Sequence, residues 1–234
     1  MTETNVRGVK LAKELCEKLD VEREEIGSLV LAFGKEDERH LDMLYRQGLE
    51  NGVPGVRLLA ADEVRAMEPN VSEQVTAALY APTAAIVSPW EFALALAETA
   101  VVNGCDLQLS APVTGIDRLE EGYLLHTPKG DFEARYVVNA AGLHCDKVHE
   151  MAGGTGFTVH GVRGEYYIMD KSQGHVVNHV IFQCPNEKGK GVLVSPTVHG
   201  NLIVGPSADA VDDVESVANT AFGLEEVRTA AARS

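Results

Sequence analysis

The segment RYVVNAAG, residues 135–142, constrains the fold more than any other part of this sequence. Its residues 136–138 are of types favoured in strands, and they predict a buried strand. Ala140, Ala141 and Gly142 follow, and they are small enough for another molecule, such as a nucleotide, to lie against the backbone. A tight strand-to-helix turn without any ligand uses the same residue types. The tripeptide alone leaves both interpretations open.

Composition narrows the class of protein. The chain has 234 residues, of which 45% are hydrophobic and 24% charged, as in an ordinary globular protein. Its net charge of -15 argues against nucleic acid as a partner, because binding a phosphate backbone takes a basic patch. An anionic small molecule remains compatible when one or two Arg or His side chains hold it. No apolar run approaches the ~18 residues of a membrane span, and the start lacks a signal-peptide core, so we predict a cytoplasmic protein.

The clearest local pattern is a helix over residues 87–104. Ser88 as N-cap, Pro89 at the first helical position and Glu91 three residues after the cap form a capping box. Asn103-Gly104 supplies the left-handed exit. The apolar spacing predicts a buried side made of Trp90, Leu94, Ala97 and Val101.

The segments before this helix alternate between helix and strand. Apolar spacing predicts amphipathic helices over residues 8–19 and 38–51, with a buried strand over 27–33 between them. A short strand and a helix follow, with Asp62 as the expected N-cap and a stop at Pro69.

The segments after the helix are rich in strands. A short strand over 106–110 and a small antiparallel meander over 111–138 are predicted, with turns at Glu121-Gly122 and Lys129-Gly130. Four strands of a second sheet are predicted within 162–207. The chain is therefore expected to be α/β, or mixed α+β.

Several motifs, in the same order, resemble one known family. They are IVSPWEFALALAETAVVNG, APVTGIDR, VVNAAGLHCDKV, VRGEYYIMDK and GVLVSPTVHGNLIVGPSA. Together they resemble the middle of FAD-dependent oxidoreductases of the D-amino-acid oxidase superfamily, in particular glycerol-3-phosphate dehydrogenase-like and L-2-hydroxyglutarate oxidase-like members. The resemblance covers nearly the whole chain, and a set of ordered motifs is far more specific than a single one.

The resemblance implies a partial Rossmann-like FAD domain and a substrate-binding domain with a mixed, mainly antiparallel sheet. Residues 1–85 and 154–234 are expected to build the substrate-binding domain, including a helical tail. Residues 86–153 are expected to form the middle part of the FAD domain, which leaves an apolar surface for self-association.

The resemblance also assigns cofactor contacts. Val113 matches the position whose backbone faces the adenine, and Ala140, Ala141 and Gly142 match the turn beside the diphosphate and ribose. The family's G-x-G-x-x-G segment, whose glycines let the backbone reach the diphosphate, does not occur in these residues. We therefore expect a central fragment of an enzyme that by itself does not retain FAD.

Three residues are candidates for substrate chemistry. Arg163 and Tyr166 match a family motif of the substrate domain, and an Arg there can hold a carboxylate or phosphate bidentately. An ion pair of Arg163 with Glu165 is the structural alternative. His199 lies in a predicted strand-to-strand turn, where a neutral imidazole can take a hydroxyl proton while hydride passes to the flavin. A solvent-exposed turn histidine is the alternative.

The expected function is oxidation of a small hydroxy acid, glycerol 3-phosphate or amino acid by hydride transfer to FAD. A non-catalytic ligand-binding or scaffold module derived from the substrate domain is the alternative. The His and Cys residues show no known metal-ligand spacing, so no metal is expected.

Overall fold

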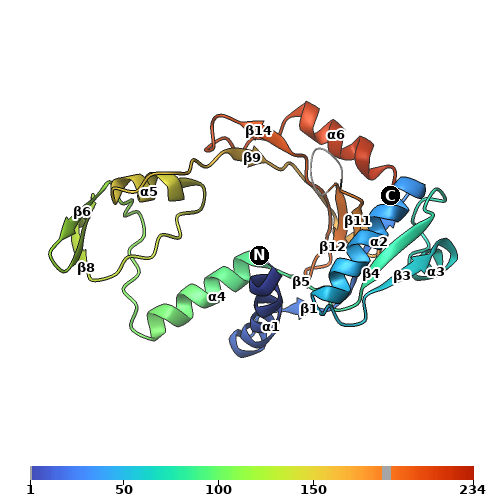
Figure 1. Ribbon diagram of the computed structural model, residues 1–234, viewed down its shortest axis with the longest axis horizontal. Helices are drawn as coiled ribbons and strands as arrows, with labels where there is room; N and C mark the ends of the chain where they lie inside the picture. The colour runs from blue at the N-terminus through green and yellow to red at the C-terminus, as the bar shows by residue number, and fades with distance from the viewer. Residues whose placement is uncertain (1, 186–190) are drawn as a thin grey trace. The chain divides into compact units, whose positions relative to one another are not determined.

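The computed structural model describes residues 2–185 and 191–234 (Figure 1). Contacts between residues divide the chain into two compact units. Unit 1 comprises Met1–Ala100, Gly164–Asp209 and Ala218–Ser234, and unit 2 comprises Val101–Arg163 and Ala210–Val217. The helices are α1 (Thr2–Leu19), α2 (Lys35–Glu50), α3 (Ala61–Met67), α4 (Pro89–Val102), α5 (Cys145–Met151) and α6 (Ala221–Ala231).

Unit 1 is built on a seven-stranded sheet in the order β10-β13-β12-β11-β2-β4-β3 (Figure 1). Its strands are β2 (Ser28–Ala32), β3 (Arg57–Ala60), β4 (Ala77–Ala81), β10 (Tyr167–Met169), β11 (Val180–Gln183), β12 (Leu193–Pro196) and β13 (Leu202–Gly205). β11 runs parallel to β2, and all other neighbouring strands of this sheet are antiparallel. This confirms the mixed, mainly antiparallel sheet and the α/β class.

Alternating side chains of β2 enter two different cores, as the period of a strand requires. Leu29 and Leu31 pack in one cluster with Val64 of α3. Ala32 packs in the other cluster with Leu41 of α2. The sheet is therefore covered by helices on both faces near β2, which explains why the 27–33 segment is apolar throughout.

The predictions for the first 70 residues hold with one exception. α1, β2 and α2 confirm the two helices and the strand. The prediction that Asp62 caps α3 is wrong, because the chain passes directly from β3 into the helix and the cap position falls on Ala60. The Glu63 carboxylate accepts the Ala60 N–H at 3.0 Å, and Asp62 instead binds Arg65 at 2.9 Å.

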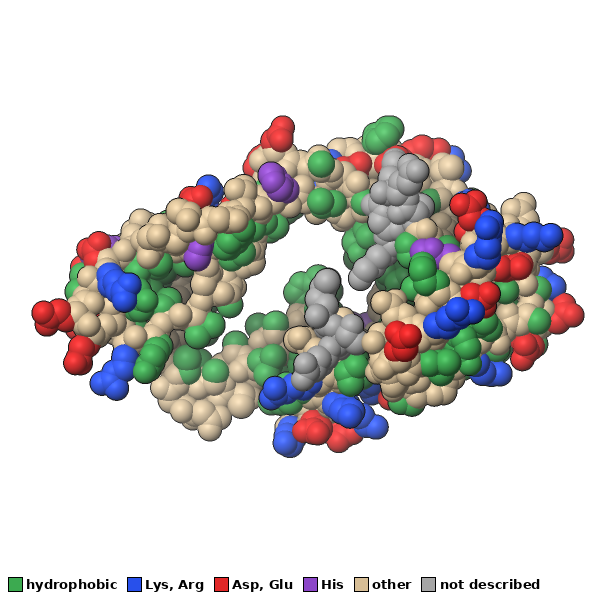
Figure 2. Space-filling model, viewed as in Figure 1, with side chains coloured by type: hydrophobic (Ala, Val, Ile, Leu, Met, Phe, Trp, Pro, Cys, Tyr) green, Lys and Arg blue, Asp and Glu red, His purple; other side chains and the backbone are tan. Residues whose placement is uncertain are grey.

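α4 begins as predicted but does not bury the predicted face. The Ser88 hydroxyl accepts the Glu91 N–H at 3.3 Å, which confirms the cap. The side chains of Trp90, Leu94 and Val101 are exposed, with Trp90 at 74%. Figure 2 shows uncharged and hydrophobic side chains gathered along this helix. The prediction of a buried face is wrong for this chain, because no element in the described part of it covers α4.

Unit 2 contains the predicted meander. Its strands are β6 (Gly115–Leu119), β7 (Gly122–Thr127) and β8 (Gly130–Ala134), which pair antiparallel in sequence order. Gly122 and Gly130 have φ of +118° and +115°, so the two predicted turns use the conformational freedom of glycine.

Two predicted strands of unit 2 do not form. Residues 106–110 and 136–138 lie outside any strand, and Val138 is 88% exposed rather than buried. The ladder of β8 ends where Ala134 pairs with Tyr123. Beyond Ala134, none of the described residues places a strand alongside, and a lone strand leaves its backbone groups without a ladder.

Two short sheets complete the fold. β1 (Arg23–Glu24) pairs antiparallel with β5 (Ile86–Val87), and β9 (Gly161–Arg163) pairs with β14 (Asp209–Val211). Within residues 2–185 and 191–234, no helix has both the length and the apolar character needed to cross a membrane.

Candidate functional site

The Ala140–Gly142 segment is held in a defined turn by Asn139. The side-chain amide of Asn139 donates to the Cys145 carbonyl at 2.8 Å, and its Oδ1 accepts the Ala141 N–H at 3.2 Å. Gly142 has φ of +57°, a left-handed conformation that glycine adopts without a steric penalty. These bonds fix the entry into α5.

The turn is open. Ala140, Ala141 and Gly142 are exposed, and a Cβ added at Gly142 would meet no atom of the described chain within 4 Å. Packing inside unit 2 therefore does not require small residues here. Their size leaves the backbone accessible to a molecule lying against it, which fits a cofactor.

These residues fit one wall of an FAD site. Val113, half-buried just before β6, was predicted to face the adenine. The diphosphate of a dinucleotide needs glycine-rich backbone at a helix N-terminus, and no G-x-G-x-x-G occurs in the 234 residues. The chain thus supplies side-wall contacts and not the diphosphate cradle.

Arg163 and Tyr166 lie on either side of a unit boundary. Arg163 ends β9 in unit 2 and is half-buried, and Tyr166 immediately precedes β10 in unit 1. Burial raises the pKa of the Tyr166 phenol above its usual value, so the hydroxyl stays protonated and able to donate a hydrogen bond at neutral pH.

His199 occupies the turn between β12 and β13, as its sequence context predicted. Its side chain is exposed, and its Nε2 lies 3.3 Å from Oε1 of Glu91 in the first turn of α4. A carboxylate at this distance orients the imidazole and favours its protonated form. The two residues are 108 positions apart, so sequence reasoning gave no signal for this partner.

The structure places His199 and Tyr166 at opposite ends of the sheet. In the β10–β13 pair, Tyr167 lies opposite Val204 and Met169 opposite Leu202. Tyr166 therefore lies at the level of Gly205, whereas His199 precedes β13 at its other end. At about 3.3 Å per residue the ends of this strand pair are more than about 10 Å apart.

Tyr166 lines a cavity of about 650 Å³ between the sheet and α6. Phe182, Leu193 and Pro206 form part of its apolar wall, and Phe222 and Arg233 enter from the α6 segment. A cavity of this size, mostly apolar with a few polar groups, is typical of small-molecule sites. Sequence analysis missed the α6 residues, although Thr220 before a helical pattern was an available N-cap signal.

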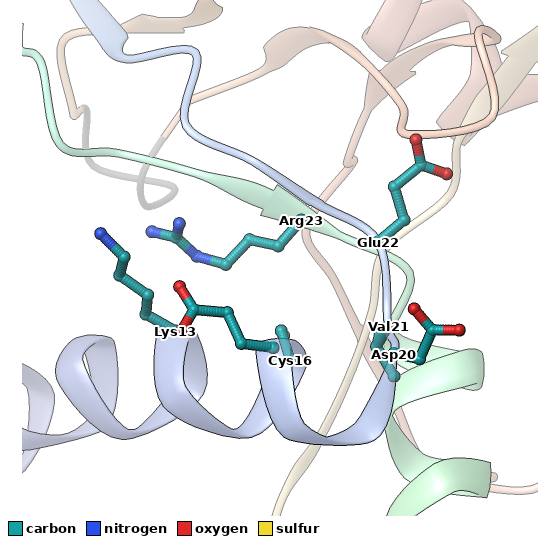
Figure 3. A pocket seen from close by; sticks show the side chains of 7 residues that line it. Lys13, Cys16, Asp20, Val21, Glu22 and Arg23 are labelled. Atoms are coloured by element: carbon teal, nitrogen blue, oxygen red, sulfur yellow. The ribbon is translucent and has the colours of Figure 1, made fainter.

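A second cavity of about 360 Å³ lies between α1 and β1 (Figure 3). Arg23 extends from β1 along α1 toward Lys13, whereas Asp20 and Glu22 lie at the other end of the cavity. Arg23 is already paired with Glu25 at 3.2 Å. The mixed charges do not select one ligand class.

Metal ligation has no support within the described ranges, where no three His, Cys, Asp or Glu side chains are placed to hold an ion. The chemistry available at the sites above is therefore cofactor contact at the 140–142 turn, anion binding by arginine, and proton transfer by histidine.

Comparison with solved structures defines the class of protein. The L-alpha-glycerophosphate oxidase of Mycoplasma pneumoniae, solved with FAD bound, matches with a TM-score of 0.90 at 26% identity, covering 99% of this chain and 62% of that one. Glycine oxidase from Geobacillus kaustophilus matches with a TM-score of 0.83 at 26% identity, covering 99% of this chain and 60% of that one. The fold is that of flavin-dependent oxidoreductases.

The chain belongs to the FAD dependent oxidoreductase family, which it matches over residues 1–234. A glycerol 3-phosphate dehydrogenase of Caloramator mitchellensis is 44% identical, covering 98% of this chain and 48% of that protein. The human mitochondrial L-2-hydroxyglutarate dehydrogenase is 28% identical, covering 87% of this chain and 47% of that protein. The chain spans about half the length of these relatives.

Proposed function

We propose that the complete protein oxidises glycerol 3-phosphate, with FAD as the hydride acceptor. The observation that carries this proposal is the 44% identity to a glycerol 3-phosphate dehydrogenase across 98% of the chain. L-2-hydroxyglutarate is the second substrate candidate, on the similarity to its dehydrogenases at 28% and 30% identity. FAD supplies the hydride chemistry, and the protein supplies binding, orientation and proton transfer. We further propose a cytoplasmic location, which cell fractionation tests.

We assign roles to the candidate residues on the same basis. Ala140, Ala141 and Gly142, together with Val113, lie against the cofactor, and residues 1–85 and 154–234 belong to the substrate-binding domain. Arg163 holds the substrate's anionic group, because its guanidinium is permanently charged and can bind two oxygens at once.

Tyr166 and His199 receive alternative assignments. Because they lie at opposite ends of the β10–β13 pair, one small substrate cannot contact both side chains within unit 1. Tyr166 donates a hydrogen bond to the substrate if the cavity beneath α6 is the substrate site. His199, oriented by Glu91, takes the hydroxyl proton if the substrate lies at the other end.

The experiment is steady-state kinetics on the complete protein loaded with FAD. Anaerobic bleaching of the flavin by glycerol 3-phosphate, and not by L-2-hydroxyglutarate, supports the proposed substrate. Arg163→Met should lower kcat/KM by about two orders of magnitude with little change in melting temperature, as expected for a lost bidentate contact. His199→Gln should depress kcat and remove a pH dependence near neutrality if His199 is the base. No bleaching by either compound would favour the non-catalytic binding module.

The cofactor contacts are tested on the 234-residue chain alone. We expect it to elute colourless from gel filtration after incubation with FAD, because the diphosphate cradle is not among its residues. Stoichiometric flavin absorbance in the protein peak would show that the missing glycine-rich segment is dispensable.

A further inference from the structure

Glu165 is a buried carboxylate that the proposed reaction does not use. Its residue is 1% exposed, in the short segment between β9 and β10 and next to Tyr166. The Thr220 N–H donates to its Oε2 at 2.6 Å and the Thr220 hydroxyl donates to its Oε1 at 2.9 Å. A buried carboxylate is costly unless such bonds compensate for the loss of water.

These bonds join Glu165 to the start of α6. Thr220 is the N-cap of that helix, and its hydroxyl also accepts the Gly223 N–H at 3.0 Å. A negative charge at a helix N-terminus interacts favourably with the helix dipole and the free N–H groups. The carboxylate and the cap therefore form one hydrogen-bonded unit.

Gly223 shows how closely the helix approaches the carboxylate. A Cβ at this position would lie 2.6 Å from both Cδ and Oε1 of Glu165, well inside van der Waals contact. The carboxylate cannot move aside without losing its bonds to Thr220. Glycine is therefore required in the first turn of α6 by this contact.

The backbone of Glu165 is fixed as well. Its N–H donates to the Ser207 hydroxyl at 3.1 Å, and the Ser207 N–H donates to the Glu165 carbonyl at 3.1 Å. The Ser207 hydroxyl in turn donates to Asp209 at 2.9 Å. Glu165 thus ties together three segments: its own, the one after β13, and α6.

Each of these three segments supplies a wall of the 650 Å³ cavity. Tyr166 comes from the first, Pro206 and Ser207 from the second, and Phe222 from the third. We propose that Glu165 is a positioning residue, which sets the separation of α6 and Tyr166 and thereby the shape of this cavity for the substrate. This inference rests on the proposed function, with the substrate in the cavity beneath α6.

The first test is kinetic, on the complete FAD-loaded protein with glycerol 3-phosphate. Glu165→Gln keeps the shape but loses the charge, and Gly223→Ala pushes on the carboxylate from the helix side. Both should raise KM about tenfold and leave kcat within about twofold, since misplaced binding groups weaken binding more than chemistry. Arg228→Gln, which removes an exposed α6 ion pair with Glu225, is the matched control and should change neither constant. An unchanged KM in both flavin-loaded variants, or a fall in kcat alone, would overturn the inference.

The second test does not depend on the reaction. Hydrogen exchange should become about tenfold faster or more in both the first turn of α6 and residues 164–167 of Glu165→Gln, while β2 stays protected. Thr220→Ser, which keeps the hydroxyl, should restore wild-type exchange relative to Thr220→Ala. If the complete protein oxidises neither substrate, the proposed function fails while exchange still decides the positioning role. Unchanged exchange in both segments would refute that role whatever the activity.

Discussion

Units 1 and 2 differ in how they bury apolar side chains. In unit 1, the sheet packs against α2 and α3 through side chains that are fully buried, such as Leu29, Leu31 and Leu41. In unit 2, Val138 and Tyr136 are exposed although their sequence is that of a buried strand. The difference teaches that a sequence can carry the pattern of a core residue where the same chain does not supply the core.

The meander of unit 2 shows the same point from the opposite side. β6, β7 and β8 form a complete ladder because hairpin pairing needs only neighbours in sequence. A second layer is needed to bury one face of such a sheet. Secondary structure and burial therefore have separate requirements in unit 2, whereas in unit 1 they are met together.

The largest expected effect separates the two units by core truncation. Leu31→Ala should lower the free energy of unfolding by about 2–5 kcal/mol, because it removes buried methyl groups and leaves a cavity. Val138→Ala, at an exposed site, should change it by less than about 0.5 kcal/mol. Urea denaturation followed by circular dichroism measures both. Equal losses would mean that residues 136–138 are buried in solution.

The next effect compares a buried ion pair with exposed ones. Glu68 is fully buried in unit 1, 2.6 Å from His179 Nδ1, and it also accepts the Asn178 N–H at 2.8 Å. Glu68→Ala should cost about 3 kcal/mol, because it leaves both partners without their acceptor. Arg228→Ala, at an exposed pair, should cost less than about 1 kcal/mol. A near-neutral Glu68→Ala would contradict the close packing assigned to unit 1.

The third prediction concerns the exposed face of α4. We expect the chain alone to self-associate through Trp90 and Leu94, because their apolar surface lacks a covering element among the described residues. Trp90→Glu should weaken this association about tenfold, measured by sedimentation velocity over a range of concentrations. Met43→Glu, at another exposed apolar residue, is the control. A monomeric wild-type chain at high concentration would remove the basis for this interface.

The smallest expected effect tests the meander. His126 lies between two carboxylates, with Nε2 2.9 Å from Asp117 and Nδ1 2.9 Å from Asp131. Hydrogen bonds to Asp117 and then Asp131 raise the pKa of His126 above 6.5. The stabilisation is therefore complete below about pH 6.5 and is lost as the pH rises through the folded-state pKa.

Nuclear magnetic resonance titration of the His126 ring checks this prediction. The pKa of His126 should fall toward its ordinary value in Asp117→Asn, and by a smaller amount in Asp131→Asn. The stability of unit 2, and not of unit 1, should follow the titration. A His126 that titrates near 6.5 in the unaltered chain would show that the two bonds do not persist in water.

The limits of sequence reasoning are visible in particular residues. The α4 cap at Ser88, the glycine turns at 122 and 130, and the mixed sheet were all predictable, because caps, turns and strands depend on residues close in sequence. The cap of α3 was misassigned by two positions, since the chain enters that helix directly from β3. The pairing of His199 with Glu91, and of Glu165 with Thr220, joins distant segments that no local pattern connects.

The sequence by itself determined the helices, most of the strands, and the family through its ordered motifs, because these depend on local periodicity and on residue identity. Only the tertiary structure decided that Tyr166 and His199 lie at opposite ends of a strand pair, that Glu165 holds α6 over a cavity, and that the 136–138 segment is exposed. Those outcomes depend on which segments pack together. Packing depends on pairwise contacts between residues far apart in the chain, and a one-dimensional pattern does not encode them singly.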